Sequence, residues 1–185
     1  MAGEVVKLSI RANSCALLLF AMWSLHYAVT ISASESAPMT VIKLSADIAT
    51  TPDLVYDYVT RPARWKEWHP ASQGVHDITD ESLVAGRRFE EEVLSAGRQR
   101  RLTWLVEESR PGQRWRASAY MADGSTVRLT YEMAAAGEGT RFTRTLEYTL
   151  RPRLLRWLND LFLWKKIQAE SEKALANLCA RLTSR

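Results

Sequence analysis

Two charged side chains lie on strand faces that are otherwise apolar. Arg144 comes two residues after Phe142, and Glu91 comes two residues after Phe89. Successive side chains of a strand point to opposite faces, so each charge shares the inward face of the preceding aromatic residue. A buried charge is unfavourable unless it is paired. The alternation therefore predicts that Arg144 and Glu91 contact each other or a ligand, unless β-bulges turn them outward.

These positions define the chemistry that the chain offers. An inward arginine can bind a carboxylate, phosphate or carbonyl group of a ligand, and the alternative is a structural ion pair or a solvated cavity mouth. Tyr131 and Tyr148 can supply hydroxyl groups or take part in proton transfer, although tyrosines on the inner face of a sheet often serve packing alone. The candidate catalytic residues are Arg144, Glu91, Tyr131 and Tyr148.

Other polar groups fit known chemistries less well. His69 and His76, with Glu67 and Asp77, match no compact metal-ligand spacing, so we interpret the histidines as surface or loop residues and expect no metal. The chain has no Gly-x-Ser-x-Gly, P-loop or dinucleotide motif, so we expect no cofactor. The basic run 97–101 indicates a solvated turn and no nucleic-acid site, because the formal net charge is only +4 and no aromatic stacking platform accompanies it.

The elements that must position these residues follow from periodicity. Alternating apolar residues, separated by glycine-containing turns, predict strands over residues 41–49, 75–78, 87–94, 101–108, 114–121, 126–134 and 141–150. Two short helices are expected after the first strand, one starting at Pro52 and one between Pro62 and Pro70 that carries Trp65 and Trp68 on one face. After Pro152, apolar residues recur at intervals of three and four, which predicts an amphipathic helix of roughly thirty residues.

The arrangement of these elements follows from their lengths. Short turns make the strands antiparallel neighbours, and a sheet with one apolar face must be covered. Only the C-terminal helix is long enough to cover it. The sequence therefore predicts an α+β fold in which a curved seven-stranded antiparallel sheet wraps around a long C-terminal helix, with a cavity where the two do not touch.

Residues 1–38 differ in composition from the rest of the chain. Basic residues precede a nearly uncharged run of about seventeen residues, 15–31, which is typical of a signal peptide or a short membrane anchor. The domain pattern begins directly after Met39, so translation from Met39, with a mis-annotated upstream segment, is a third alternative. The domain is exported or membrane-anchored in the first two cases and cytoplasmic in the third.

Four motifs within this order of elements are specific. They are IATTPDLVYDYV at 48–59, WKEWHP at 65–70, GRRF at 86–89 and GTRFTR at 139–144. Together with the element order, they resemble the START-like helix-grip superfamily, in particular the SRPBCC branch, or polyketide cyclase/dehydrase and lipid transport family. The resemblance extends from Val41 to about Leu182. Tyr56 departs from it, because many relatives look to have tryptophan there, a change that concerns the pocket or the core and leaves the fold unaffected.

The resemblance implies a helix-grip, SRPBCC-like domain over 39–185 with a deep hydrophobic cavity. The inward aromatic, apolar and charged residues are then the candidate ligand-binding residues: Phe89, Glu91, Trp104, Trp115, Leu129, Tyr131, Phe142, Arg144, Tyr148, Leu161 and Trp164. Three functions are consistent with such a domain. The leading hypothesis is noncatalytic binding or transport of a small hydrophobic ligand, either lipid-like or polycyclic. The alternative is a polyketide cyclase/dehydrase-type enzyme that uses the inward polar residues without a metal or nucleotide cofactor. The third is a regulatory or structural partner protein without a ligand.

A basic and aromatic segment precedes and begins the long helix. Basic and aromatic residues together favour a membrane-facing or anion-attracting portal, and acidic neighbours elsewhere in the fold are the alternative explanation. The residues concerned are Arg151, Arg153, Arg156, Trp157, Phe162 and Trp164. The oligomeric state stays open.

Overall fold

The computed structural model describes residues 39–151 and 153–183. The signal peptide, anchor or upstream segment expected over 1–38 lies outside the described residues. Within the described ranges, no helix combines the length and the apolar character needed to cross a membrane.

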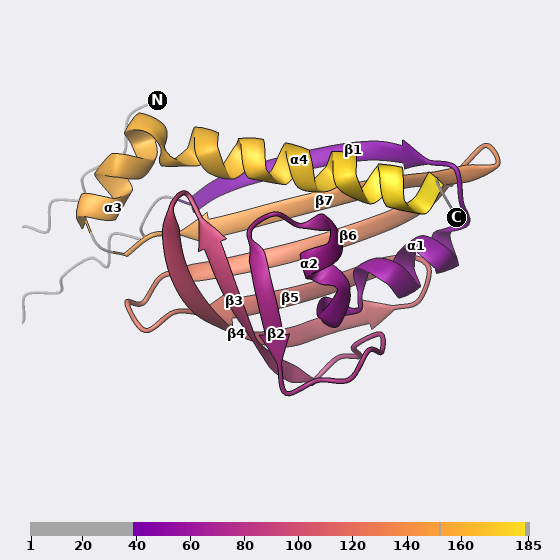
Figure 1. Cartoon of the computed structure of the whole chain (residues 1–185), viewed down its shortest axis with the longest axis horizontal. Coiled ribbons are helices and arrows are strands. Elements are labelled where there is room, and N and C mark those ends of the chain that lie inside the picture. The colour runs from indigo at the N-terminus through magenta and orange to yellow at the C-terminus, as the bar shows by residue number, and fades with distance from the viewer. Residues whose placement is uncertain (1–38, 152, 184–185) are drawn as a thin grey trace, which may run out of the picture. The chain divides into compact units, whose positions relative to one another are not determined.

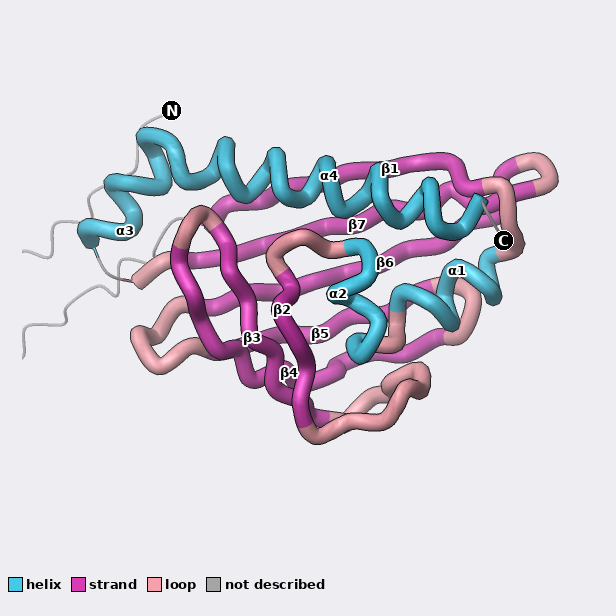
Figure 2. Tube along the Cα trace, in the orientation of Figure 1, coloured by secondary structure: helices cyan, strands magenta, loops and turns pink. Residues whose placement is uncertain are grey.

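The seven predicted strands form one antiparallel sheet with the order β1-β7-β6-β5-β4-β3-β2. The helix-grip fold predicted from the sequence is confirmed, and Figure 2 shows the strands lying side by side with the helices on one face. The strands are β1 (Met39–Ile48), β2 (Ser72–His76), β3 (Arg88–Ser95), β4 (Arg98–Arg110), β5 (Arg114–Tyr120), β6 (Thr126–Ala136) and β7 (Gly139–Thr149).

The second strand differs from its predicted range. It was expected over 75–78, but β2 begins at Ser72 and ends at His76. Asp77 has a left-handed backbone, with a φ of 62°, so the chain turns out of the sheet there. Register shifts at Ser72/Gly74 and at Val106/Glu108 interrupt the ladders, and such bulges bend a sheet.

The helices cover the inner face of the sheet. The first group comprises α1 (Pro52–Val59), the 3-10 helix η1 (Pro62–Arg64) and α2 (Trp65–Trp68). The C-terminal group comprises α3 (Arg153–Leu158), the π-helical turn η2 (Asn159–Leu163) and α4 (Trp164–Thr183). In Figure 1, α4 runs alongside β1, and α1 and α2 lie beside it over the middle of the sheet.

The π-helical turn corrects the prediction of one uninterrupted helix. A π turn holds one residue more than an α turn, so the side chains after it are rotated by roughly 100° from their expected direction. Leu161 was predicted to face inward but is 52% exposed, whereas Leu155 and Leu163 are buried. Trp164 is only half-buried. The buried residues before η2 and those after it therefore do not follow one continuous α-helical repeat.

Aromatic side chains form the densest part of the core. Trp65 makes edge-to-face contacts with Phe89, Trp104 and Trp115, at centroid distances of 5.6 to 6.0 Å. Trp115 also stacks on Tyr131 at 5.6 Å. Such pairs add about 0.5–1.5 kcal/mol each beyond their buried area. The contacts of Trp65 fix α2 against β3, β4 and β5.

Candidate functional site

A largely apolar cavity of about 150 Å³ lies between the inner face of the sheet and the C-terminal helices. Its walls come from β3, β4, β6 and β7, from the loop after α2, and from α3, η2 and α4. Apolar lining residues include Leu102, Leu129, Leu146, Leu155, Leu163 and Ile167. A cavity of about this size lined by apolar side chains can hold a ligand of roughly benzene size without rearrangement.

Arg144 is the main polar group of the cavity wall. Its side chain comes from β7, and the residue is only 4% exposed. One terminal nitrogen, Nη1, donates to Ser171 Oγ at 3.1 Å, and Nη2 lies 3.0 Å from His69 Nε2. The third guanidinium nitrogen, Nε, is buried and has no hydrogen-bond partner. The arginine thus uses two of its five N–H groups in these bonds, and the Nε–H is among the donors that remain.

Glu91 lines the cavity from β3 and is also 4% exposed. The indole Nε1 of Trp104 donates to its Oε2 at 2.9 Å. Burial raises the pKa of the Glu91 carboxyl to about 7, although the nearby Ser72 hydroxyl, the Trp104 hydrogen bond and the charge of Arg144 act in the opposite direction. The group therefore gains or loses a proton near neutral pH.

His69 follows α2 and contacts Arg144 across the cavity wall. Burial, followed by the adjacent Arg144 charge, lowers the pKa of His69 to about 3, so the ring is neutral. A neutral imidazole offers one acceptor nitrogen, and a guanidinium can only donate. Nε2 therefore accepts a hydrogen bond from Arg144, and Nδ1 carries the ring proton. A protonated Nδ1 cannot accept, so the Ala71 N–H, 3.3 Å away, is a close contact and not a hydrogen bond.

The two candidate tyrosines differ in their surroundings. Tyr131 is 1% exposed, and burial raises the pKa of its hydroxyl while the neighbouring Arg144 lowers it. Its neutral hydroxyl lies beside the arginine, whose guanidinium can only donate to it. Tyr148 instead donates to Asn159 Oδ1 at 2.7 Å, and Asn159 donates to Thr40 Oγ1 at 3.1 Å. The Tyr148 hydroxyl thus ties β7 to η2 and β1.

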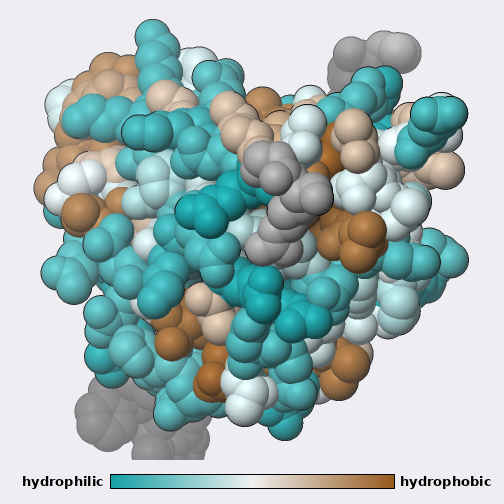
Figure 3. All heavy atoms as spheres, turned by 45° about the vertical axis from the view of Figure 1, so that its right-hand side comes forward, coloured by the Kyte–Doolittle hydropathy of each residue, from teal (hydrophilic) through white to brown (hydrophobic). Residues whose placement is uncertain are grey.

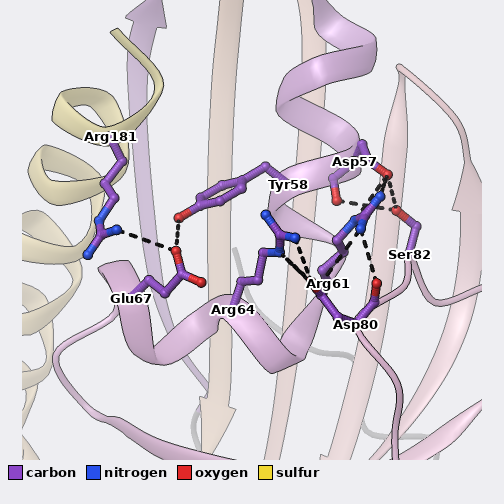
Figure 4. Close-up of polar contacts among 8 residues, drawn as sticks. All are labelled: Asp57, Tyr58, Arg61, Arg64, Glu67, Asp80, Ser82 and Arg181. Atoms are coloured by element: carbon purple, nitrogen blue, oxygen red, sulfur yellow. Dashed lines mark hydrogen bonds and ion pairs between the residues drawn. The ribbon is translucent and has the colours of Figure 1, made fainter. Parts of the chain in front are cut away.

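The short helices that carry His69 are held by surface ion pairs. Figure 4 shows Tyr58 and Arg181 meeting at Glu67, at 2.9 Å and 3.4 Å. The same view shows Arg61 and Arg64 joined to Asp57 and Asp80. Trp65 contributes an internal bond, since its Nε1 donates to Val59 O at 2.8 Å. These contacts fix α2 relative to α1 and α4.

A carboxylate on α4 fastens the β3–β4 turn over one end of the cavity. Glu170 accepts from Ser95 Oγ at 2.6 Å and from the Ala96 N–H at 2.8 Å. Ala96 and Gly97 have φ values of 50° and 76°, as a two-residue hairpin turn with both residues left-handed requires. Ser95, Ala96 and Glu170 all line the cavity.

The structure brings together only part of the predicted site. Six of the predicted residues line the cavity: Glu91, Trp104, Leu129, Tyr131, Arg144 and Tyr148. The other five do not line the cavity in this structure, and their ligand-binding role stays a prediction: Phe89, Trp115, Phe142, Leu161 and Trp164. The first three face inward but pack in the core; Trp115, for example, donates to Leu83 O at 2.9 Å. The last two are displaced by the π-helical turn.

His69 is a cavity-lining residue that the sequence reasoning missed. It was interpreted as a surface or loop histidine, and it does follow a short helix, but its ring lines the cavity. Loop residues carry no periodicity that reveals their direction. The motif WKEWHP, which contains His69, was the available signal. Within the described ranges, no three His, Cys, Asp or Glu side chains are grouped so as to hold a metal ion.

The fold and the cavity define a class of protein, the helix-grip domains, in which a bent antiparallel sheet holds a long C-terminal helix over an internal cavity. Residues 39–183 match the family model described as polyketide cyclase / dehydrase and lipid transport. The chain belongs to this family. No curated protein matches the chain significantly.

Solved structures support the fold. The protein TTHA0849 from Thermus thermophilus is 21% identical, with a TM-score of 0.65 over 78% of this chain and 98% of that chain. The Zhui aromatase/cyclase from a Streptomyces species is 14% identical, with a TM-score of 0.65 over 80% and 96% of the two chains. A START superfamily protein from Mycobacterium smegmatis is 12% identical, with a TM-score of 0.58 over 78% and 97%.

Proposed function

We propose that this domain binds or transports a small hydrophobic molecule in the cavity, with one polar group of the ligand directed at Arg144. The supporting observation is the combination of apolar walls with a buried guanidinium that retains an unpartnered Nε. Leaving a buried donor unpaired costs about 1–3 kcal/mol, and more when it is charged. This nitrogen is fully covered in the structure, so a ligand oxygen can recover that free energy only after the surrounding side chains shift to admit it.

The neighbours of Arg144 define the polar group that fits. Ser171 and His69 are neutral, and each accepts one N–H group from a terminal nitrogen of Arg144. Glu91 is the nearby acid, but its own bond is to Trp104. A carbonyl, hydroxyl or carboxylate oxygen suits the Nε donor. The rest of the ligand is apolar, because apolar side chains make up most of the surrounding wall.

An enzymatic function is the second candidate, and one observation favours it. The Glu91 pKa of about 7 allows this carboxyl to exchange a proton at neutral pH. With Arg144 polarising a carbonyl and Glu91 moving a proton, the site has the groups for a cyclisation or dehydration. The aromatase/cyclase named above shares the fold. In that function, the pH profile of turnover contains an apparent pKa near 7 that the Glu91→Gln variant lacks.

Native mass spectrometry of the protein purified from cells, followed by organic extraction, tests the proposal. The expected result is a co-purifying hydrophobic compound. The Ile167→Trp variant fills the cavity from α4, where Ile167 is half-buried, and should lose this compound. Arg141→Met is the matched control for Arg144→Met, because Arg141 lies on the same strand but is exposed and paired with Asp47.

The outcome separates the three functions. A ligand lost in Ile167→Trp and weakened in Arg144→Met, but retained in Arg141→Met, supports binding or transport. Turnover of a supplied polyketide-like substrate that depends on Glu91 supports the enzyme. If the purified protein carries no ligand and a fluorescent fatty acid binds equally to wild type and Ile167→Trp, the cavity is not a binding site. A partner protein without a ligand then becomes the better explanation.

A further inference from the structure

The C-terminal helical segment exposes a group of large apolar side chains on one face. Leu154, Trp157, Leu161 and Phe162 are 65%, 59%, 52% and 41% exposed, and we call them the α3–η2 surface. All four come from nine consecutive residues, 154–162, whereas other exposed apolar residues, such as Leu54, are scattered over different elements. Most of the face seen in Figure 3 is hydrophilic. Clustered exposed apolar groups indicate an interaction site.

Basic residues surround this surface. Residues 151–166 contain five basic side chains and one acidic side chain. In the described part of the chain, none of the five forms an ion pair, whereas Arg116 and Arg128 on the outer sheet face share Glu107. Lys166 instead lies over the Phe162 ring at 5.7 Å. Acidic neighbours therefore do not neutralise this segment, and it attracts an anionic partner.

The same segment forms part of the cavity wall. Leu155 and Leu163 line the cavity from the helix face opposite the exposed residues. Figure 1 shows α3 at the same end of the domain as the β3–β4 turn, whose residue Arg98 also lines the cavity. A partner on the α3–η2 surface thus lies one helix diameter from the cavity.

The start of the described chain lies beside this surface as well. Thr40, the second residue of β1, accepts a hydrogen bond from Asn159 in η2. Asn159 belongs to the same turn as Leu161 and Phe162, so the first strand borders the α3–η2 surface.

We propose that the α3–η2 surface docks on a phospholipid bilayer that contains anionic lipids, so that the cavity end near the β3–β4 turn faces the membrane. Exposed tryptophan, phenylalanine and leucine residues flanked by arginine and lysine suit the interfacial region of a bilayer. A second copy of this chain fits less well, because self-association would bring the unpaired cations of two segments together. The docking does not require that the cavity holds a ligand.

Hydrogen–deuterium exchange of the full chain with lipid vesicles tests the docking at residue level, so that binding through 1–38 does not obscure it. The vesicles are phosphatidylcholine alone, or phosphatidylcholine mixed with phosphatidylglycerol. The expected result is protection of 153–166 with the mixed vesicles, weaker protection at high salt, and no change over α1. If 153–166 exchange equally with and without the mixed vesicles, the proposal is overturned. Protection that appears without vesicles as the protein concentration rises assigns the surface to self-association and also overturns it.

Variants separate the apolar and the basic contributions. Replacing Trp157 by alanine should weaken binding to the mixed vesicles by about tenfold, from loss of buried apolar area. Arg153→Gln should weaken it by about fivefold, since each basic residue near an anionic surface contributes about 1 kcal/mol. Leu54→Ala on α1 and Arg88→Gln on β3 are matched controls with exposed side chains. Unchanged protection of 153–166 in Trp157→Ala would show that this side chain does not anchor the domain on the bilayer. An equal loss of vesicle binding in the two control variants would refute the proposal.

Discussion

Replacement of Glu91 by glutamine should make the protein more stable at alkaline pH. In the wild type, burial holds the carboxyl pKa near 7 in the folded state, against about 4.5 in an unfolded chain. A raised pKa of an acid means that the folded state binds the proton more tightly. The resulting stabilisation is fully present below pH 4.5 and is lost as pH rises through 7.

The magnitude follows from the two pKa values. Each pH unit between them corresponds to about 1.4 kcal/mol, so the ionised carboxylate costs the fold about 3 kcal/mol above pH 7 relative to its neutral form. Glutamine never ionises, and its amide oxygen can still accept from Trp104. The free energy of unfolding of Glu91→Gln, minus that of the wild type, should therefore rise by about 3 kcal/mol between pH 4 and pH 9.

Urea denaturation of both proteins at several pH values measures this difference. Subtracting one curve from the other cancels the titration of groups that do not interact with Glu91, such as His69, whose pKa is set by burial and Arg144. Glu92→Gln, at the next position of β3, is the control because Glu92 is partly exposed and paired with Arg101. A difference curve that stays flat from pH 4 to pH 9 would refute the assignment of a raised pKa to Glu91.

Three further predictions concern the same region. Arg144→Met should raise the Glu91 pKa further, because the guanidinium charge lowers it; carbon-detected NMR titration of the Glu91 carboxyl measures the shift, and a lower pKa would contradict the assignment. Tyr148→Phe should reduce the free energy of unfolding by about 1–2 kcal/mol, since it leaves Asn159 without its 2.7 Å donor; urea denaturation measures this, and a neutral change would show that the bond is dispensable. Glu170→Ala should release the β3–β4 turn and speed hydrogen exchange of its amides, with unaltered exchange as the contrary result.

The alternation along a strand predicted which face of the sheet a side chain lies on. It did not predict whether an inward apolar side chain packs in the core or lines the cavity. The alternation around Arg144 and Glu91 correctly placed both side chains inward, because a strand has only two faces. The same alternation placed Phe89 and Trp115 inward, yet these residues pack against Trp65 and not against the cavity. Core and cavity lining share one face of the sheet, and only the packing of the opposing helix separates them.

The apolar repeat of the C-terminal helix predicted its buried face correctly except near the π-helical turn η2. The turn over Asn159–Leu163 contains one extra residue, and no glycine or proline marks it in the sequence. Asn159, its first residue, bonds to the distant partners Tyr148 and Thr40. A pattern read along the chain cannot include such tertiary bonds, so it placed Leu161 inward although this residue is 52% exposed.

The pairing of β1 with β7 has a consequence for biosynthesis. Partners such as Lys43 and Thr145 are separated by about a hundred residues. On a ribosome, β1 emerges first and must wait for nearly the whole domain before its partner strand exists. During that interval its backbone donors and acceptors are open to pairing with other chains. We therefore expect the central hairpins to form early, and the nascent protein to need protection of its first strand until synthesis is almost complete.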